Sequence, residues 1–132
     1  MRRFAFIFLF LFVFTGCGHA AEPVGTIQTT LYFGLDLADG GRIDEEDWSD
    51  FLASVVTPLF PDGFTVIDAY GQWRDPVAAN APVLRERTKI VIIVHRATGE
   101  TKAAISEIKA IYRSRFAQKS VFHTETPARV VE

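Results

Sequence analysis

Strands are predicted where apolar residues alternate with polar ones or form short runs. Leu31, Phe33 and Leu35 alternate with polar or small positions within residues 27–35, which predicts the first strand. Residues 90–94 are apolar on both faces, which is typical of a central strand covered on both sides. Further strand predictions cover residues 64–73, 83–95 and 120–124.

Two helices are predicted between these strands. Asp44 is a suitable N-cap for the first helix, and Thr57-Pro58 predicts its end. Between them lies one apolar stripe with helical spacing, formed by Trp48, Phe51, Leu52, Val55 and Val56. The second helix is predicted at residues 98–118, with basic residues late, as the helix dipole favours.

The resulting order, β-α-β-β-α-β, predicts an α+β fold of the ferredoxin-like type. In that fold an antiparallel sheet carries both helices on one face and leaves the other face open. A monomer would then expose Val91 and Ile93. We therefore expect a homodimer that covers the open sheet face.

The N-terminus has the pattern of a secretion signal. Arg2 and Arg3 precede an uninterrupted apolar run at residues 4–14. This run is too short to span a bilayer, which needs about 20 residues, and it suits a signal peptide. We expect a signal peptide at 1–16, a tether at 17–26, a single domain at 27–124 and a flexible tail at 125–132.

Two cleavage sites compete after this run. Phe14-Thr15-Gly16-Cys17 resembles a bacterial lipobox, although Phe14 departs from the usual Leu. The predicted result is a lipid on Cys17 that anchors the protein in the cell envelope, at the periplasmic side of the outer membrane if the host has one. The alternative is cleavage after Ala20, which would release a soluble periplasmic protein without Cys17.

Composition and charge exclude some classes of function. The formal charge is −2, and losing the two positive charges of Arg2 and Arg3 would make it −4. A negative domain is a poor nucleic-acid binder, so we expect no nucleic-acid partner. Cys17 is the single cysteine, so no intrachain disulfide can form.

The middle hairpin carries the most suggestive chemistry. If position 75 pairs with position 83, the open face receives a group of cationic and aromatic side chains. This candidate ligand site comprises Tyr32, Trp73, Arg85, Arg87 and Lys89. Such a group suits a small anionic ligand, because arginine makes two-point contacts with a carboxylate. The structural alternative is an exposed hairpin end in which Arg85 stacks on Trp73.

The other candidate groups indicate a chemical function less strongly. In the same register Glu86 points to the helix side with Gln72, where it is a candidate for a buried acid with a raised pKa or simply an ion-pair partner. His19, His95 and His123 lack metal-ligand spacing, so we expect neither a metal nor a cofactor. No nucleophile elbow, phosphate loop or dinucleotide fingerprint is present in the sequence, and the catalytic residues stay unknown.

Several blocks of the sequence together resemble the bacterial domain-of-unknown-function family 3574, whose members often follow a lipoprotein signal. The resemblance covers about residues 29–122 and implies a shared exported domain, without a particular activity. The blocks are residues 31–34, 56–58, 60–66, 71–75 and 85–89, with Tyr112, Phe116, Gln118, Ser120 and Val121.

These observations predict a lipid-anchored envelope protein that acts as a binding module for a small ligand or a protein, rather than an enzyme. One alternative is an enzyme acting on a small anionic molecule at the open sheet face of a dimer, which rests on analogy of fold alone. The other is a purely structural partner of an envelope assembly.

Overall fold

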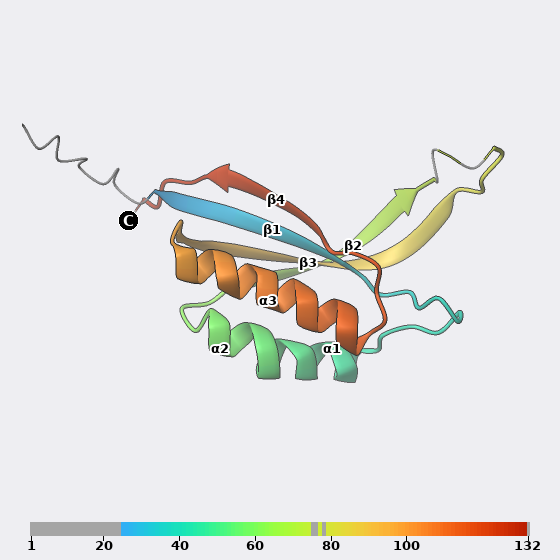
Figure 1. The fold of residues 1–132 in the computed structure, drawn as a ribbon, viewed down its shortest axis with the longest axis horizontal. Helices are drawn as coiled ribbons and strands as arrows, with labels where there is room; N and C mark the ends of the chain where they lie inside the picture. The colour runs from blue at the N-terminus through green and yellow to red at the C-terminus, as the bar shows by residue number, and fades with distance from the viewer. Residues whose placement is uncertain (1–24, 75–76, 78, 132) are drawn as a thin grey trace, which may run out of the picture.

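The computed structural model describes residues 25–74, 77 and 79–131, and these form an α+β domain. Its elements are β1 (Thr26–Gly34), α1 (Glu45–Phe51), a π-helical segment η1 (Leu52–Val56), α2 (Thr57–Leu59), β2 (Thr65–Trp73), β3 (Leu84–Arg96), α3 (Gly99–Arg115) and β4 (Phe122–Pro127). The strands form one sheet in the order β2-β3-β1-β4, and every neighbouring pair is antiparallel. Figure 1 shows the helices on one side of this sheet.

The β2–β3 hairpin is longer than the strand beside it. β1 ends at Gly34, opposite Thr88. Beyond this point β2 and β3 pair with each other, apart from one hydrogen bond from the Leu35 N–H to the Arg87 carbonyl. This extension, residues 70–73 and 84–87, is the hairpin arm, and it projects past the helices in Figure 1. The arm forms one wall of a surface hollow described below.

The first helical segment follows its predicted start but not its predicted end. The Asp44 carboxylate accepts a hydrogen bond from the Asp47 N–H, as expected of an N-cap. The prediction that Thr57-Pro58 ends the helix was wrong, because the helical path continues to Leu59. Proline lacks the N–H that an α-helical turn requires. The preceding segment is π-helical, and the Thr57 N–H bonds to the Leu52 carbonyl five residues back.

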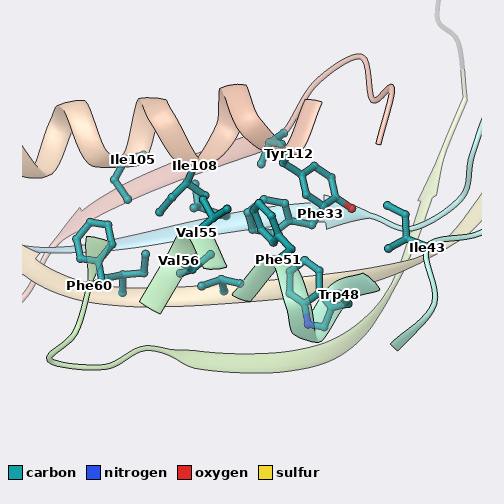
Figure 2. Close-up of a cluster of buried hydrophobic side chains, with 14 of the residues drawn as sticks. Phe33, Ile43, Trp48, Phe51, Val55, Val56, Phe60, Ile105, Ile108 and Tyr112 are labelled. Carbon is teal, nitrogen blue, oxygen red and sulfur yellow. The ribbon is translucent and has the colours of Figure 1, made fainter. Parts of the chain in front are cut away.

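The core lies between the sheet and the helices. Phe33 of β1 is fully buried, and its ring lies 4.6 Å from that of Tyr112 on α3 and 5.8 Å from that of Phe51 on α1. Figure 2 shows these aromatic rings grouped at one end of the core, with aliphatic side chains such as Ile105 and Ile108 toward the other. Aromatic pairs at such separations add to the stabilisation from apolar burial.

The predicted register of the middle hairpin was wrong by one residue. Trp73 pairs with Leu84, not with Arg85, and Asp68 pairs with Lys89. A slip of one residue moves every side chain of a strand to the other face. Val91 and Ile93 are therefore fully buried in the core. The run at residues 90–94 is apolar at every position, so its pattern could not show which set faces the helices.

The ends of the later elements also differ from expectation. Thr98 caps α3 through a reciprocal pair of hydrogen bonds with Thr101, as the predicted start requires. The final strand begins at Phe122 and continues to Pro127, three residues past its predicted end. Pairing with β1 orders this part of the predicted tail, since Glu125 lies opposite Thr29 and Thr126 opposite Gln28.

Candidate functional site

The structure separates the five predicted ligand-site residues. Tyr32 and Trp73 lie on the sheet face away from the helices. Arg85, Arg87 and Lys89 alternate with that face and point to the helix side. Arg85 donates a hydrogen bond to the Gln72 side chain at 3.0 Å, and Lys89 is buried. The five therefore form no single site, and the register slip is the cause.

Lys89 is a buried cation held by two acids. Its Nζ lies 2.7 Å from a Glu45 carboxylate oxygen and 2.6 Å from an Asp68 carboxylate oxygen. Desolvation lowers the pKa of the Lys89 amine, but hydrogen bonds and Coulomb attraction from Asp68 and Glu45 outweigh it, so the pKa is raised above its ordinary value. This arrangement explains how a lysine fits on the core side of a central strand.

Next to Lys89 lies a hollow, which we call the arm hollow, between the base of the hairpin arm, the 35–44 loop and the start of α1. Its volume is about 640 Å³, within the range of small-molecule sites. It is lined by Leu35, Arg42, Ile43, Asp44, Glu45, Asp68, Ala69, Tyr70, Arg87 and Thr88. Of these residues, Arg87 belongs to the ligand site predicted from the sequence.

The charged groups of the arm hollow differ in whether their hydrogen-bonding atoms already have partners. The Arg87 side chain makes no hydrogen bond or ion pair with any described residue. Arg42 donates through its Nε to Asp36 at 3.1 Å, which leaves its terminal nitrogens available. Glu45 and Asp68 are bound to Lys89, yet their side chains are 75% and 85% exposed, so each keeps acceptor sites facing water. The hollow thus offers both free donors and free acceptors.

The remaining lining residues gave weak sequence signals. The isolated bridge between Asp36 and Arg42 closes the loop and brings Arg42 near α1. Tyr70 lies opposite Arg87 across the hairpin and is 67% exposed. In the sequence, the acidic residues at 44–47 are explained by the start of a helix. Their position beside Lys89 depends on the tertiary fold. Only the correct register would have placed Tyr70 and Asp68 beside Arg87 and Lys89.

Glu86 lies on the open sheet face, not on the helix side as predicted. Its carboxylate sits against Gly34, where an added Cβ would come within 2.9 Å of it. Burial raises the pKa of the Glu86 carboxyl, and the nearby Asp36 carboxylate raises it further. Tyr112 donates its hydroxyl to the Gly34 carbonyl at 2.8 Å, and burial, with a contribution from Glu86, holds its pKa well above the usual range.

The two histidines of the described chain have structural partners. His95 contacts the Thr29 hydroxyl and the Arg96 carbonyl, each at 2.8 Å, and His123 lies 3.0 Å from a Glu125 carboxylate oxygen. Across residues 25–74, 77 and 79–131, no group of three or more His, Cys, Asp or Glu side chains is arranged to hold a metal ion.

The sheet face away from the helices, which we call the open face, carries exposed apolar side chains. It comprises the even-numbered residues of β1, β3 and β4 and the odd-numbered residues of β2. One row crosses all four strands without a polar break and consists of Phe122, Tyr32, Ile90 and Ile67. Phe122 is 65% exposed and Ile67 44%, while Tyr32 and Ile90 are half-buried, so the described residues leave the two ends of this row uncovered.

These features define a small α+β domain with a charged hollow on the helix side and an apolar open sheet face. The chain belongs to the family described as "Protein of unknown function (DUF3574)", which matches residues 28–131 and confirms the resemblance found in the sequence. No curated protein matches the chain.

Among solved structures the fold resembles that of a phage SAM lyase in complex with S-methyl-5'-thioadenosine. The TM-score is 0.62 at 16% sequence identity, and the match covers 81% of this chain and 86% of the lyase chain. At this identity the likeness shows the fold alone.

The predicted anchor lies outside the described residues. Cys17 and the competing site at Ala20 both precede residue 25, where the description begins. Within the described part, no helix is both long enough and apolar enough to cross a membrane.

Proposed function

We propose that this protein is an exported lipoprotein, anchored through Cys17, whose domain is a ligand-binding module of the cell envelope. Its ligand site is the arm hollow, and its ligand is a small molecule that carries both an anionic and a cationic group. The observation that carries this proposal is the Arg87 guanidinium, which has no hydrogen-bond or ion-pair partner among the described residues and lines a hollow of about 640 Å³. The domain itself we assign to the ferredoxin-like folds, supported by the strand order and by the shared side of the helices.

The cationic side of the hollow suits a carboxylate. Arg87 and the terminal nitrogens of Arg42 present planar donor pairs from two different elements, which favours two-point contacts with an anionic group. This keeps the small anionic ligand expected from the sequence but moves its site. Arg85 is excluded from the site because its side chain is hydrogen-bonded to Gln72. Lys89 is excluded because its amine is already paired with Glu45 and Asp68.

The acidic side of the hollow suits an amine. Asp68 and Glu45 together carry two negative charges against the single charge of Lys89. A purely anionic ligand would meet this excess of negative charge on the same wall. A molecule with both charges, such as an amino acid or a related zwitterion, satisfies both sides at once.

The test of the hollow is native mass spectrometry of protein purified from its own envelope. We expect a co-purified small molecule in the wild type and its loss in Arg87→Gln. Arg85→Gln is the matched control, because Arg85 lies on the same strand and face but does not line the hollow. Equal retention by Arg87→Gln and Arg85→Gln would overturn the site, as would a wild type that carries no ligand.

The charge requirement has its own test. L-glutamine, L-glutaminamide without the carboxylate, and N-acetyl-L-glutamine without the amine are added in thermal-shift titrations. The zwitterion should stabilise the wild type most, since ligand binding to the folded state raises its stability. Equal stabilisation by all three, or by none, contradicts a zwitterion site.

The anchor is tested by cell fractionation. Cys17→Ser should abolish the membrane-bound mature form, because no other residue of the chain can take the lipid. An unchanged membrane fraction would show that the anchor is wrong, and a soluble wild type would favour cleavage after Ala20.

The enzymatic alternative has one supporting observation, the partly buried Glu86 carboxyl with a raised pKa on the open face. The solved structure of similar fold is a SAM lyase with bound S-methyl-5'-thioadenosine. Incubating the protein with SAM and measuring release of S-methyl-5'-thioadenosine tests this alternative. Release that is lost in Glu86→Gln supports an enzyme, and no release by the wild type speaks against this activity.

A further inference from the structure

We infer that a second hollow, between α3 and β4, binds the phosphate group of a small soluble molecule or of a lipid headgroup. This α3–β4 hollow has a volume of about 310 Å³ and is lined by Ser106, Lys109, Arg113, Ser120 and Val121. It shares no lining residue with the arm hollow, so the inference is independent of the ligand proposal above.

The first observation is a flank of α3 that carries only positive charge. Lys102, Lys109 and Arg113 fall within about 40° of one another around the helix, whereas its acids, Glu100 and Glu107, fall more than about 120° away from them. Lys109 and Arg113 are four residues apart, and like charges at this spacing destabilise a helix. The helix dipole favours Arg113 in the last turn but not Lys109, which lies before that turn. The flank therefore gathers positive charge that the helix does not require.

The second observation is the sharp reversal of the chain after α3, which supplies the other wall of the hollow. The Gln118 N–H bonds to the Arg113 carbonyl at 3.0 Å, and Ala117 adopts a left-handed backbone with a φ of 50°. This is the Schellman type of helix end. Figure 1 shows the chain turning back at this end of α3. Ser120 and Val121 thereby join Arg113 around one hollow, and Val121 is held in place because it is part of the core.

The third observation is that donors lining the hollow have few partners. The Arg113 guanidinium and the Ser120 hydroxyl make no hydrogen bond or ion pair with any described residue. Lys109 is half-buried, and its Nζ lies 3.5 Å from Nδ1 of His123. Nε2 of the same ring lies 3.0 Å from a Glu125 carboxylate oxygen, which fixes the ring. These contacts hold the Lys109 amine beside β4 and leave two of its three N–H groups available.

These donors suit a phosphate group better than a carboxylate. Lys109 and Arg113 bring two positive charges, which match the charge of a phosphate monoester. The arginine fork makes two-point contacts with phosphate oxygens, and lysine binds them as a point charge. Ser120 adds a donor from a different segment, so the donors reach more oxygens than the two of a carboxylate. Ser106 already donates its hydroxyl to the Lys102 carbonyl at 3.0 Å, so we assign it no donor role.

The experiment is isothermal titration calorimetry of the mature protein with inorganic phosphate and with sn-glycerol 3-phosphate. The ionic strength is about 0.15 M, at which exposed charges more than about 8 Å apart are largely screened. We expect both probes to bind the wild type, and Lys109→Gln and Arg113→Gln should each weaken binding about tenfold or more.

Lys102→Gln is the matched control for Lys109→Gln. It removes the same charge from the same flank, about 10 Å along the helix, from a residue that does not line the hollow. It should change the affinity less than about twofold. Equal losses in Lys109→Gln and Lys102→Gln would show general attraction to a basic flank and overturn the site.

A short-chain lipid distinguishes the two sources of phosphate. Dihexanoyl phosphatidylglycerol is titrated below its critical micelle concentration, with dihexanoyl phosphatidylcholine as the zwitterionic control. If phosphatidylglycerol binds more tightly than glycerol 3-phosphate and loses affinity in Arg113→Gln, the ligand is a lipid headgroup; the reverse order assigns a soluble phosphate ester. Far-UV circular dichroism verifies that each variant is folded. A folded wild type that binds neither phosphate, glycerol 3-phosphate nor phosphatidylglycerol would overturn the inference.

Discussion

Lys89 and its two acids give a prediction in which removing the anions costs more stability than removing the cation. The Lys89 side chain is 6% exposed, whereas those of Glu45 and Asp68 are 75% and 85% exposed. The acids can return to water when Lys89 is replaced. The amine cannot do so without moving its buried stem, so it stays desolvated when the acids are neutralised.

The magnitudes follow from this asymmetry. Lys89→Met keeps a flexible apolar side chain in the buried space and loses ion pairs to exposed acids, each worth about 0–1 kcal/mol, so we expect a net cost of about 0–1 kcal/mol. Glu45→Gln with Asp68→Asn leaves a charged amine with only neutral partners. Its poorly compensated desolvation should cost about 2 kcal/mol.

The assay is urea denaturation at pH 7, with the free energy of unfolding taken from the midpoint and slope. Adding Lys89→Met to the Glu45→Gln/Asp68→Asn variant should recover most of the lost stability, because the desolvated charge is then gone. The reasoning is refuted if Lys89→Met costs as much as the double variant, or if the triple variant shows no recovery.

The pH dependence gives a second readout of the same site. The folded pKa of Lys89 is raised, so its contribution to stability is fully present below the unfolded pKa of about 10.4 and is lost as the pH rises through the higher folded value. Neutralising both acids leaves desolvation, which lowers the pKa. The double variant should therefore lose less stability than the wild type as the pH rises above about 10.4.

Two further predictions concern groups near the end of β1. Tyr112→Phe removes the hydroxyl that donates a hydrogen bond to the Gly34 carbonyl, and it should cost about 1–2 kcal/mol of unfolding free energy in urea denaturation. The control Tyr32→Phe, on the open face, should cost less than about 0.5 kcal/mol. Equal costs for the two variants would show that the Tyr112 hydrogen bond contributes nothing. Glu86→Gln should stabilise the monomer at pH 7. The folded pKa of Glu86 is raised, so the contribution of its protonated form to stability is fully present below the unfolded pKa of about 4.3 and is lost as the pH rises through the folded value. Glutamine is neutral at every pH and avoids this loss. The gain should vanish below about pH 4, measured by tryptophan fluorescence at sub-micromolar concentration, and a gain that persists there would point to a cause other than titration.

Local signals in the sequence were sufficient for the elements and the family. The strand alternation at Leu31 and Phe33 identified the core side of β1, and both of these residues are buried. The N-cap signal of Asp44 marked the start of the first helix, because capping depends on residues within a few positions of each other. The apolar run at residues 90–94 correctly indicated a central strand, since β3 lies between β2 and β1 in the sheet.

Tertiary structure decided the register and, through it, the candidate site. Nothing local distinguishes the Val91 and Ile93 set from the Ile90 and Ile92 set, because both are apolar β-branched residues. What selects the observed set is packing against Phe33 and the helices, together with the acids that allow Lys89 to sit on the core side. The sequence by itself therefore determined the elements, the α+β class and the family, while the three-dimensional fold decided which side chains meet. Residues as distant as Arg42, Asp68 and Arg87 form one hollow only after the sheet, loop and helix come together.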